Sequence, residues 1–240
     1  MEIDVCFSPA LYPHYHRVEA EVVIADIFRA TTTLVAAFES GARSILPVAT
    51  VEEAEAWKAR GWPVGAERNV RRCPFADFGN SPFDYTPEKV AGKDLVFTTT
   101  NGTKAIRCAG EAGRIVTGAF VNLRAVADDC LREGRPVVVL CSGWEDKINI
   151  EDTLFGGALA AVLLSHGYRP AGDAVRIALS LWKEAEKDLR GYLEPAEHIA
   201  RLRSAGLEDN IPYCMALNRS SLLPVYSKGE GKLVIERNQS

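Results

Sequence analysis

Residues 22–33 carry the stretch VVIADIFRATTT, in which an apolar, strand-forming run breaks into Asp, Arg and threonines where a helix is expected to begin. Residues 95–105, LVFTTTNGTKA, show the same pattern, with hydroxyl groups, Asn and Gly after the apolar run. In open α/β sheets, ligands bind beyond the carboxyl ends of strands, where helix starts offer unpaired N–H groups. Both stretches therefore predict an α/β fold with an anion site at strand ends.

Composition narrows the class of protein. With 47% hydrophobic residues, the 240-residue chain can bury a full core. We therefore expect a single domain spanning residues 1–240, and a division of this domain into two lobes is the alternative. A formal net charge of -4 and the lack of a sustained Lys/Arg run argue against nucleic-acid binding. Six cysteines without a C-x-x-C pair fit reduced thiols. No apolar run reaches the roughly 18 residues of a membrane helix. A cytoplasmic location is the expectation.

Strand and helix patterns alternate through the first two thirds of the chain. This alternation predicts a mostly parallel β-sheet core flanked by helices, followed by a more helical C-terminal third and a terminal hairpin. Strands are expected at residues 3–7, 22–26, 44–48, 94–98, 114–117, 136–141, 222–226 and 232–236. Helices are expected at residues 31–40, 51–60, 102–109, 122–133, 154–166, 173–189 and 195–204. Residues 65–87 lose the apolar periodicity, which is typical of a long functional loop.

Asp26 and Arg29 are the first candidates for chemistry. A carboxylate at the end of an apolar strand suits Mg²⁺, and an arginine three residues later suits phosphate oxygens. Because Asp is also among the best helix caps, capping is the alternative for Asp26. Thr31, Thr32 and Thr33 are poor helix formers, so their presence at a helix start favours a role as hydroxyl donors to a ligand. We expect at least one of them to pack in the core or to cap the helix instead. The stretch predicts a magnesium-assisted phosphate site.

Two other segments add polar groups. Residues 98–103 lead from threonines into Asn-Gly, where a tight backbone approach is expected, and a turn stabilised by its own side chains is the alternative. Glu67 and Arg68 supply a carboxylate and a guanidinium, which a surface ion pair would also explain. Asn80 and Ser81 add an amide and a hydroxyl from the same non-periodic segment. We expect these groups to join the site.

Later positions supply a candidate nucleophile and further acids. Cys141 follows a strand that is apolar throughout, so its thiol is a candidate nucleophile, with an inert buried cysteine as the alternative. Glu151 and Asp152 at a helix start suit metal binding or general-base work, although the helix dipole favours acids there in any case. His166 and His198 are expected on the helix surface. Nucleotide chemistry is disfavoured, since the chain has neither a P-loop nor a G-x-G-x-x-G motif.

Taken together, these motifs resemble the 2-phosphosulfolactate phosphatase family. The matching strings are DIFRATTT at 26–33, ERN at 67–69, GNSP at 79–82, TTTNGT at 98–103, CSG at 141–143, ED at 151–152 and PVY at 224–226. They span nearly the whole chain in the expected order. The resemblance implies the α/β fold peculiar to that family, a bound Mg²⁺, and hydrolysis of 2-phospho-3-sulfolactate to 3-sulfolactate and phosphate in coenzyme M biosynthesis.

The mechanism expected from this resemblance rests on positioning and electrostatics, with either water or Cys141 attacking phosphorus. The groups expected to act in catalysis are Asp26, Arg29, Arg68, Cys141, Glu151 and Asp152. Asp26, Glu151 and Asp152 are the expected Mg²⁺ ligands. The expected substrate contacts are Thr31, Thr32, Glu67, Asn80, Ser81, Thr99, Thr100, Asn101, Gly102, Thr103, Ser142 and Gly143.

Two departures from the family pattern leave the substrate open. Residues 71–78 are irregular, and Ser142-Gly143-Trp144 stands where an Ala-Gly pair is expected, so another small phosphorylated organic acid is the alternative substrate. A non-catalytic sensor of an anionic metabolite is the second alternative, disfavoured because carboxylates without a cation would repel the ligand. The expected partner is a small anionic phosphorylated substrate, with no nucleic acid and no membrane, and a homodimer is left open.

Overall fold

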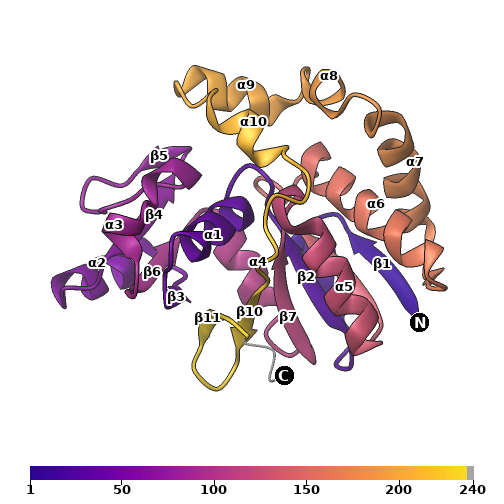
Figure 1. Ribbon diagram of the computed structural model, residues 1–240, viewed down its shortest axis with the longest axis horizontal. Coiled ribbons are helices and arrows are strands. Elements are labelled where there is room, and N and C mark those ends of the chain that lie inside the picture. Colours follow the sequence, from indigo (N-terminus) through magenta and orange to yellow (C-terminus); the bar gives the residue numbers. More distant parts are fainter. Residues whose placement is uncertain (237–240) are drawn as a thin grey trace.

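A computed structural model of the chain describes residues 1–236, which form one large sheet with helices packed around it (Figure 1). The strand order is β5-β4-β6-β3-β11-β10-β7-β2-β8-β1-β9. The strands are β1 (Glu2–Cys6), β2 (Glu21–Ala25), β3 (Ser44–Pro47), β4 (Val64–Arg68), β5 (Arg71–Arg72), β6 (Asp94–Thr98), β7 (Arg114–Gly118), β8 (Val137–Cys141), β9 (Arg169–Pro170), β10 (Pro224–Ser227) and β11 (Lys232–Ile235). The predicted α/β class is confirmed.

The terminal hairpin joins two parallel parts of the sheet. Strands β7, β2, β8, β1 and β9 form one part, and β4, β6 and β3 form the other. Strand β10 pairs with β7 through Val225 and Val116, and β11 pairs with β3 through Leu233 and Ile45, all antiparallel. The two parallel parts therefore run in opposite senses across the hairpin. The hairpin was predicted, but its place inside the sheet was not.

Helices connect the strands and make up most of the C-terminal third. They are α1 (Ala30–Glu39), α2 (Val51–Ala59), α3 (Pro87–Val90), α4 (Gly102–Cys108), α5 (Leu123–Glu133), α6 (Ile150–Ser165), α7 (Asp173–Ala185), α8 (Leu189–Leu193), α9 (Glu197–Ser204) and α10 (Asn210–Cys214). Short 3-10 helices span Pro9–His14, Pro82–Asp84 and Phe120–Asn122. Helices α8, α9 and α10 lie together at the top of Figure 1. Within residues 1–236, no helix combines the length and apolarity needed to cross a membrane.

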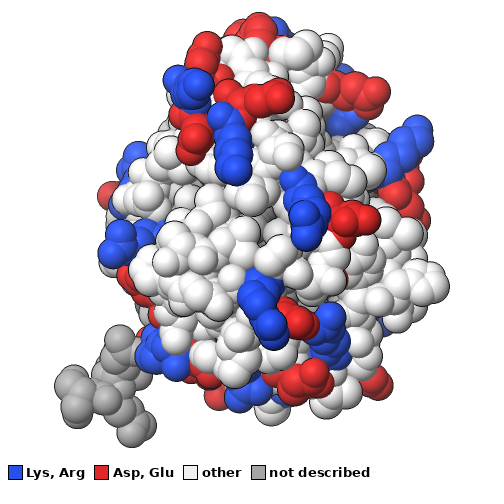
Figure 2. Space-filling model, turned by 90° about the vertical axis from the view of Figure 1, so that its right-hand side faces the viewer, with Lys and Arg blue, Asp and Glu red and all other residues white. Residues whose placement is uncertain are grey.

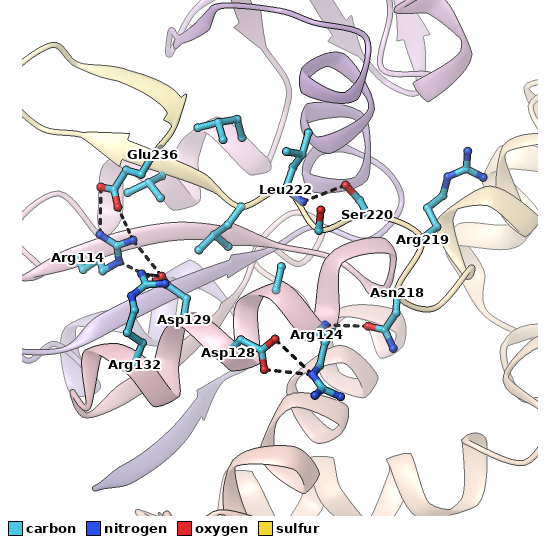
Figure 3. A pocket seen from close by; sticks show the side chains of 15 residues that line it. Arg114, Arg124, Asp128, Asp129, Arg132, Asn218, Arg219, Ser220, Leu222 and Glu236 are labelled. Carbon is cyan, nitrogen blue, oxygen red and sulfur yellow. Dashed lines mark hydrogen bonds and ion pairs between the residues drawn. The ribbon is translucent and has the colours of Figure 1, made fainter. Parts of the chain in front are cut away.

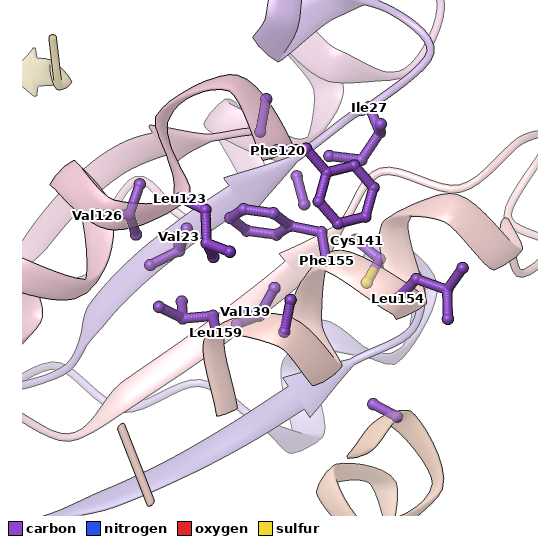
Figure 4. Close-up of a cluster of buried hydrophobic side chains, with 14 of the residues drawn as sticks. Val23, Ile27, Phe120, Leu123, Val126, Val139, Cys141, Leu154, Phe155 and Leu159 are labelled. Atoms are coloured by element: carbon purple, nitrogen blue, oxygen red, sulfur yellow. The ribbon is translucent and has the colours of Figure 1, made fainter. Parts of the chain in front are cut away.

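The central strand β8 is buried on both faces, as its continuous apolar run predicts. Val137, Val139 and Cys141 join one hydrophobic cluster, and the alternate residues Val138 and Leu140 join the other. Figure 4 shows the first cluster, where helices α5 and α6 pack on the sheet around the rings of two phenylalanines. The strands thus form a rigid layer between two cores, and their ends are held in fixed positions.

Close packing of helices α6 and α7 depends on a glycine. A Cβ at Gly157 would lie 2.1 Å from the carbonyl oxygen of Ala178 in α7, which no side chain tolerates. The sequence predicts that Gly156 and Gly157 permit such an approach at a cost of roughly 1 kcal/mol each in helix propensity. The structure confirms that prediction for the contact between the two helices.

The sequence predicts Thr50 as the N-cap of the helix at 51–60 and Asn122 as the N-cap of the helix at 122–133, and the structure confirms only the first. Thr50 and Glu53 form a capping box at α2, with the Thr50 hydroxyl accepting the Glu53 N–H at 3.1 Å. Asn122 precedes α5, but its side chain makes no cap. Its amide donates instead to the carbonyl oxygens of Thr117 and Leu222 at 3.2 and 3.0 Å. The predicted Asn122 cap is therefore wrong, since the side chain ties β7 to the segment before β10.

The expectation that residues 65–87 form only a loop is also wrong. Residues 64–68 form strand β4, which pairs in parallel with β6 and is buried along most of its length. Gly65 and Ala66 interrupt any local pattern, so the pairing with β6 decides the conformation there. Helix α6 likewise begins at Ile150, one turn before the predicted start at residue 154. Tertiary pairing overrides weak local propensity at both places.

The face seen in Figure 2 shows mixed charge. Lys and Arg side chains alternate with Asp and Glu across this side of the molecule, and neither sign gathers into a patch. On the described surface, ion pairs of opposite charge are frequent, such as Arg43 with Asp94 and Arg124 with Asp128. Long-range attraction from this face is therefore weak, and recognition of an anion depends on local groups.

Candidate active site

The turn after β2 builds one wall of the site around Asp26. Asp26 Oδ1 accepts the backbone N–H of Ala30 at 3.2 Å, at the start of α1. The Asp26 N–H donates to Thr31 Oγ1 at 3.1 Å, and that hydroxyl donates to the Asp26 carbonyl at 2.9 Å. Asp26 thus caps α1 with one carboxylate oxygen, while the other, Oδ2, faces Gly102 across the site.

The threonine hydroxyls of α1 stabilise this turn. Thr31 donates to the Asp26 carbonyl, as described, and Thr32 donates to the carbonyl of Ile27 at 2.9 Å. Thr33 donates to the carbonyl of Asn80 at 3.1 Å, which ties the segment after β4 to α1. All three hydroxyls are buried, and their protons are directed at the main chain. The structure places them behind the pocket rather than on its surface.

The turn after β6 meets the turn after β2. A Cβ at Gly102 would lie 2.7 Å from Ala30 Cβ and 3.0 Å from Asp26 Oδ2, so only glycine allows this approach. Thr103 donates to the Thr99 carbonyl at 3.0 Å, whereas the buried hydroxyls of Thr99 and Thr100 have no hydrogen-bond partner among the described residues. Of these two residues, Thr99 lines the pocket described next, so its hydroxyl is free to donate to a ligand there.

A pocket lies where these turns meet. It is lined by Asp26, Phe28, Arg29, Glu67, Val70, Asn80, Thr99, Asn101, Trp144 and His198. Six of these residues were predicted from the sequence as catalytic or substrate-binding groups. The structure thus brings together residues that lie far apart in the chain, from Asp26 to Asn101, around one small space.

Arg29 enters the pocket with its charge unpaired. Its guanidinium is 2% exposed and donates to Asn210 Oδ1 at 3.0 Å and to the Val70 carbonyl at 3.4 Å, both neutral acceptors. Among the described residues it forms no ion pair within 4 Å. The preceding Phe28–Arg29 peptide bond is cis. A buried guanidinium held only by neutral groups is suited to an anionic ligand.

The β4–β5 hairpin supplies Glu67, and the segment after it supplies Asn80. Glu67 is 5% exposed, and its Oε1 accepts the Val70 N–H at 2.5 Å. Arg68 points away from the pocket, donating to Thr98 Oγ1 at 2.9 Å. Asn80 Oδ1 is buried with no hydrogen-bond partner among the described residues. Ser81 accepts the Phe83 N–H at 3.3 Å and lines a neighbouring cavity together with Arg29 and Asn80.

The end of β8 supports the pocket from behind. Asp152 accepts the N–H of Ile27 at 2.9 Å and the N–H of Gly143 at 3.2 Å, so both its oxygens hold main-chain turns. Cys141 is fully buried, and burial raises the pKa of its thiol well above the ordinary value. Ser142 Oγ is buried without a described partner. None of these side chains lines the pocket.

Sequence reasoning missed four residues that line the pocket: Phe28, Val70, Trp144 and His198. His198 is only 6% exposed, so the expectation that it lies on the surface is wrong. It shares the buried side of α9 with Ile199 and Leu202, a spacing of one and four residues that marks an inward face. That periodicity could have indicated burial, whereas the contact of His198 with Glu151 arises only in the folded chain.

Burial and neighbouring acids set the charge of the carboxylates. Burial raises the pKa of Asp26 to about 6, with the nearby Glu67 and Glu151 adding to the effect and His198 opposing it. Burial likewise raises the pKa of Glu67, against the stabilising Val70 N–H and Arg29. Carboxylates gathered in a dry pocket repel each other in the ionised state. A bound cation would relieve this repulsion.

A larger cavity of about 620 Å³ lies elsewhere, between α5 and the segment that leads into β10 (Figure 3). Two of its arginines are paired with acids of the same cavity: Arg114 contacts Asp129 and Glu236, and Arg124 contacts Asp128. None of the catalytic, metal-binding or substrate-binding residues predicted from the sequence lines it. The smaller pocket at the strand ends is therefore the better candidate for the active site.

The fold and this pocket define a class, an α/β protein with a buried polar pocket, lined by an arginine without an ion pair among the described residues, where the turns after its strands meet. A family model described as 2-phosphosulpholactate phosphatase matches residues 6–229. The chain belongs to that family, which consists of phosphoric monoester hydrolases and confirms the resemblance noted in the sequence.

Relatives cover nearly the full length of the chain. A protein of Synechococcus sp. (strain CC9605) is 37% identical over 234 residues, covering 93% of this chain and 96% of that one. A protein of Carboxydothermus hydrogenoformans is 32% identical over 241 residues, covering 100% and 99%. A protein of Caldanaerobacter subterraneus is 32% identical over 215 residues, covering 88% and 89%. Each is named a probable 2-phosphosulfolactate phosphatase.

Proposed function

We propose that this protein hydrolyses 2-phosphosulfolactate to sulfolactate and phosphate in the cytoplasm. Family membership and the names of the relatives support this substrate. The single observation that carries the proposal is the pocket itself, in which a buried guanidinium without an ion pair, Arg29, lies beside the Asp26 carboxylate. A cationic group and a metal-binding carboxylate in one dry pocket are what a phosphate ester requires.

The donor groups of the pocket fit Mg²⁺. Asp26 Oδ2 and the unpartnered Asn80 Oδ1 are oxygen donors, which hard cations prefer. Within residues 1–236, no three His, Cys, Asp or Glu side chains gather closely enough to hold a metal by themselves. Mg²⁺ usually binds through one or two carboxylates together with substrate phosphate, so such a partial site suits it. When bound, the ion supplies Lewis-acid stabilisation of a phosphoryl oxygen.

Glu151 and Asp152 were predicted as Mg²⁺ ligands, but in this proposal they have structural roles. Asp152 holds the turns at Ile27 and Gly143 through both of its oxygens. Glu151 Oε1 lies 2.7 Å from His198 Nδ1 and so faces the imidazole. We therefore assign the metal to Asp26 and Asn80, with the Glu67 carboxylate near them.

The chain's own groups bind and orient the substrate. Arg29 offers its guanidinium to phosphate oxygens, and the unpartnered hydroxyls of Thr99 and Thr100 offer hydrogen bonds. Asn101 orients the organic acid from the same turn. The pocket has a volume of about 10 Å³, so it must widen to admit substrate. Most of the catalytic effect then comes from positioning charge in a dry site.

Phosphate release tests the proposal directly. The purified full-length chain is assayed with 2-phosphosulfolactate and a panel of small phosphorylated organic acids, with Mg²⁺ and with chelator. Mg²⁺-dependent release from 2-phosphosulfolactate is the expected result. Release only from another acid would retain the chemistry and change the substrate. Calorimetric binding of these acids without turnover would overturn the enzymatic proposal and favour the sensor alternative.

A further inference from the structure

His198 reaches the pocket from α9, and a buried carboxylate holds one side of its ring. Its Nδ1 lies 2.7 Å from Oε1 of Glu151, which belongs to α6. Only 6% of His198 and 1% of Glu151 are exposed. Because an ionised carboxylate only accepts hydrogen bonds, the shared proton belongs to Nδ1, and the ring presents its other nitrogen, Nε2, on the opposite side.

Two aromatic rings fix the plane of the imidazole. The ring centroid of Phe28 is 5.7 Å from that of His198 with an interplanar angle of 87°, and that of Trp144 is 5.9 Å away at 64°. Phe28 and Trp144 line the same pocket as His198. Arg201, from the helix that carries His198, covers the Trp144 ring at 4.5 Å. An imidazole held by a carboxylate and two rings is a preorganised group rather than a loose side chain.

Departure of the alcohol from phosphorus requires a proton donor close to the ester oxygen. Hydrolysis of the ester of a secondary alcohol expels an alkoxide, which departs readily only when it receives a proton. The other ionisable side chains that line the pocket are assigned to phosphate or to the metal ion in the proposed function. His198 is the remaining ionisable group of the lining, and its ring is hydrogen-bonded to Glu151. Its position beside Asp26 and Arg29 places it within the space that the ester must occupy.

Resting on the proposed phosphatase function, we propose that His198 is the catalytic proton donor to the leaving oxygen and that Glu151 is the positioning residue that holds its ring. In this step a water oxygen bonds to phosphorus and the bond from phosphorus to the ester oxygen breaks. The step starts from the imidazolium form, in which both ring nitrogens bear a proton. The Nδ1 proton stays on the hydrogen bond to Glu151, while the Nε2 proton passes to the departing oxygen, which becomes the hydroxyl of the product. The proton released by the attacking water returns to the imidazole through solvent, so atoms and charge balance without an oxidant or reductant.

Two substrates with different leaving groups separate this role from a structural one. The full-length chain is assayed with Mg²⁺ on 2-phosphosulfolactate and on p-nitrophenyl phosphate, whose leaving group needs no proton. His198→Gln is expected to lower kcat/KM by about 10²-fold or more on the first ester and by less than about 10-fold on the second. Glu151→Gln keeps an acceptor for Nδ1 and is expected to give a smaller loss with the same substrate dependence. His166→Gln, at the exposed end of α6, is the matched control and leaves both rates unchanged.

Each other outcome overturns the inference. Equal losses on both esters, or no loss from His198→Gln, assign His198 a structural role or none. If His198→Gln fails to fold by circular dichroism, the ratio of the two rates in Glu151→Gln decides on the same criterion. If wild type does not turn over the aryl ester, rescue of His198→Gly by added imidazole on 2-phosphosulfolactate is expected, and its absence overturns the role. Wild type that is inactive on every ester overturns the proposed function and, with it, this inference.

Discussion

Gly102→Ala tests the contact between the two turns that form the site. In the structure, a Cβ at position 102 would lie 2.7 Å from Ala30 Cβ, 3.0 Å from Asp26 Oδ2 and 3.2 Å from Thr99 Oγ1. Non-bonded carbons settle at about 3.5–4.0 Å, so the start of α4 must withdraw from α1 by about 1 Å. The backbone of both turns is fixed by strands, and the added methyl therefore displaces the groups that line the pocket.

The magnitude follows from packing and geometry. Overpacking costs about 1–3 kcal/mol, and the reduced freedom of the unfolded chain offsets about 0.4–1 kcal/mol of that. A net loss of about 1–2 kcal/mol lowers Tm by about 2–8 °C in a chain of this size. The effect on activity is larger, because a displacement of about 1 Å at reacting groups costs about 10²-fold in rate. We expect kcat/KM to fall by that factor in a folded protein.

Phosphate release and thermal unfolding measure both effects on the same samples. Gly229→Ala is the matched control, since position 229 lies in the turn between β10 and β11 and a Cβ there meets nothing within 4 Å. The control is expected to keep wild-type Tm and kcat/KM. Wild-type activity and stability in Gly102→Ala would refute the close approach of the two turns, and with it the arrangement of the pocket.

Three further changes address charge and burial. Asp26→Asn is expected to lower kcat/KM by at least about 10²-fold and to leave the residual rate independent of Mg²⁺, measured by phosphate release across Mg²⁺ concentrations. Cys141→Ser is expected to keep kcat, because the thiol is fully buried outside the pocket, while losing about 1–3 kcal/mol of stability. Burial, opposed by Arg114, raises the pKa of Glu21 from 4.5 to about 7. Between these two pH values, Glu21 is protonated in the folded chain and ionised in the unfolded chain. Stability then falls by up to about 3 kcal/mol as pH rises between those values. Glu21→Gln is expected to abolish that fall in denaturant unfolding.

Controls and contrary results are specific to each change. Asp128→Asn alters an exposed aspartate paired with Arg124 and is expected to keep full activity; Mg²⁺-dependent turnover in Asp26→Asn would remove Asp26 from the metal site. A folded but inactive Cys141→Ser would restore the thiol as the nucleophile. Glu19→Gln is the exposed control for Glu21, and an unchanged pH dependence in Glu21→Gln would show that another group causes it.

Much of the framework was predictable because local patterns and burial agree. The apolar run of β8 indicates a strand buried on both faces, and its residues do alternate between two cores. Thr50 as a cap and the acidic residues Glu52 and Glu53 in the first turn predict the start of α2, and the structure adds the reciprocal hydrogen bonds of a capping box. Where local signals are weak, as in β4 with its Gly65 and Ala66, pairing with β6 decides the structure and the sequence pattern predicts a loop.

For the site, the sequence by itself determined which residue types follow each strand: Asp26 and Arg29 after β2, and Thr99 and Asn101 after β6. Short-range sterics and hydrogen bonding account for those turns. The tertiary structure alone decided that the turns meet, because β2 and β6 lie five strand steps apart and run in opposite senses. The turns meet through the close approach of Gly102 to Ala30 and Asp26, a contact between distant parts of the chain that no local pattern encodes.

The same reason explains His198. A histidine on an amphipathic helix carries no local sign of its partner, and Glu151 lies 47 residues earlier in the chain. Their contact forms only when α9 packs across the start of α6, and burying the two groups together is what gives each its hydrogen bond. The sequence thus predicted which types of side chain the site contains. Which of these side chains lie close together depended on long-range packing, which no local pattern encodes.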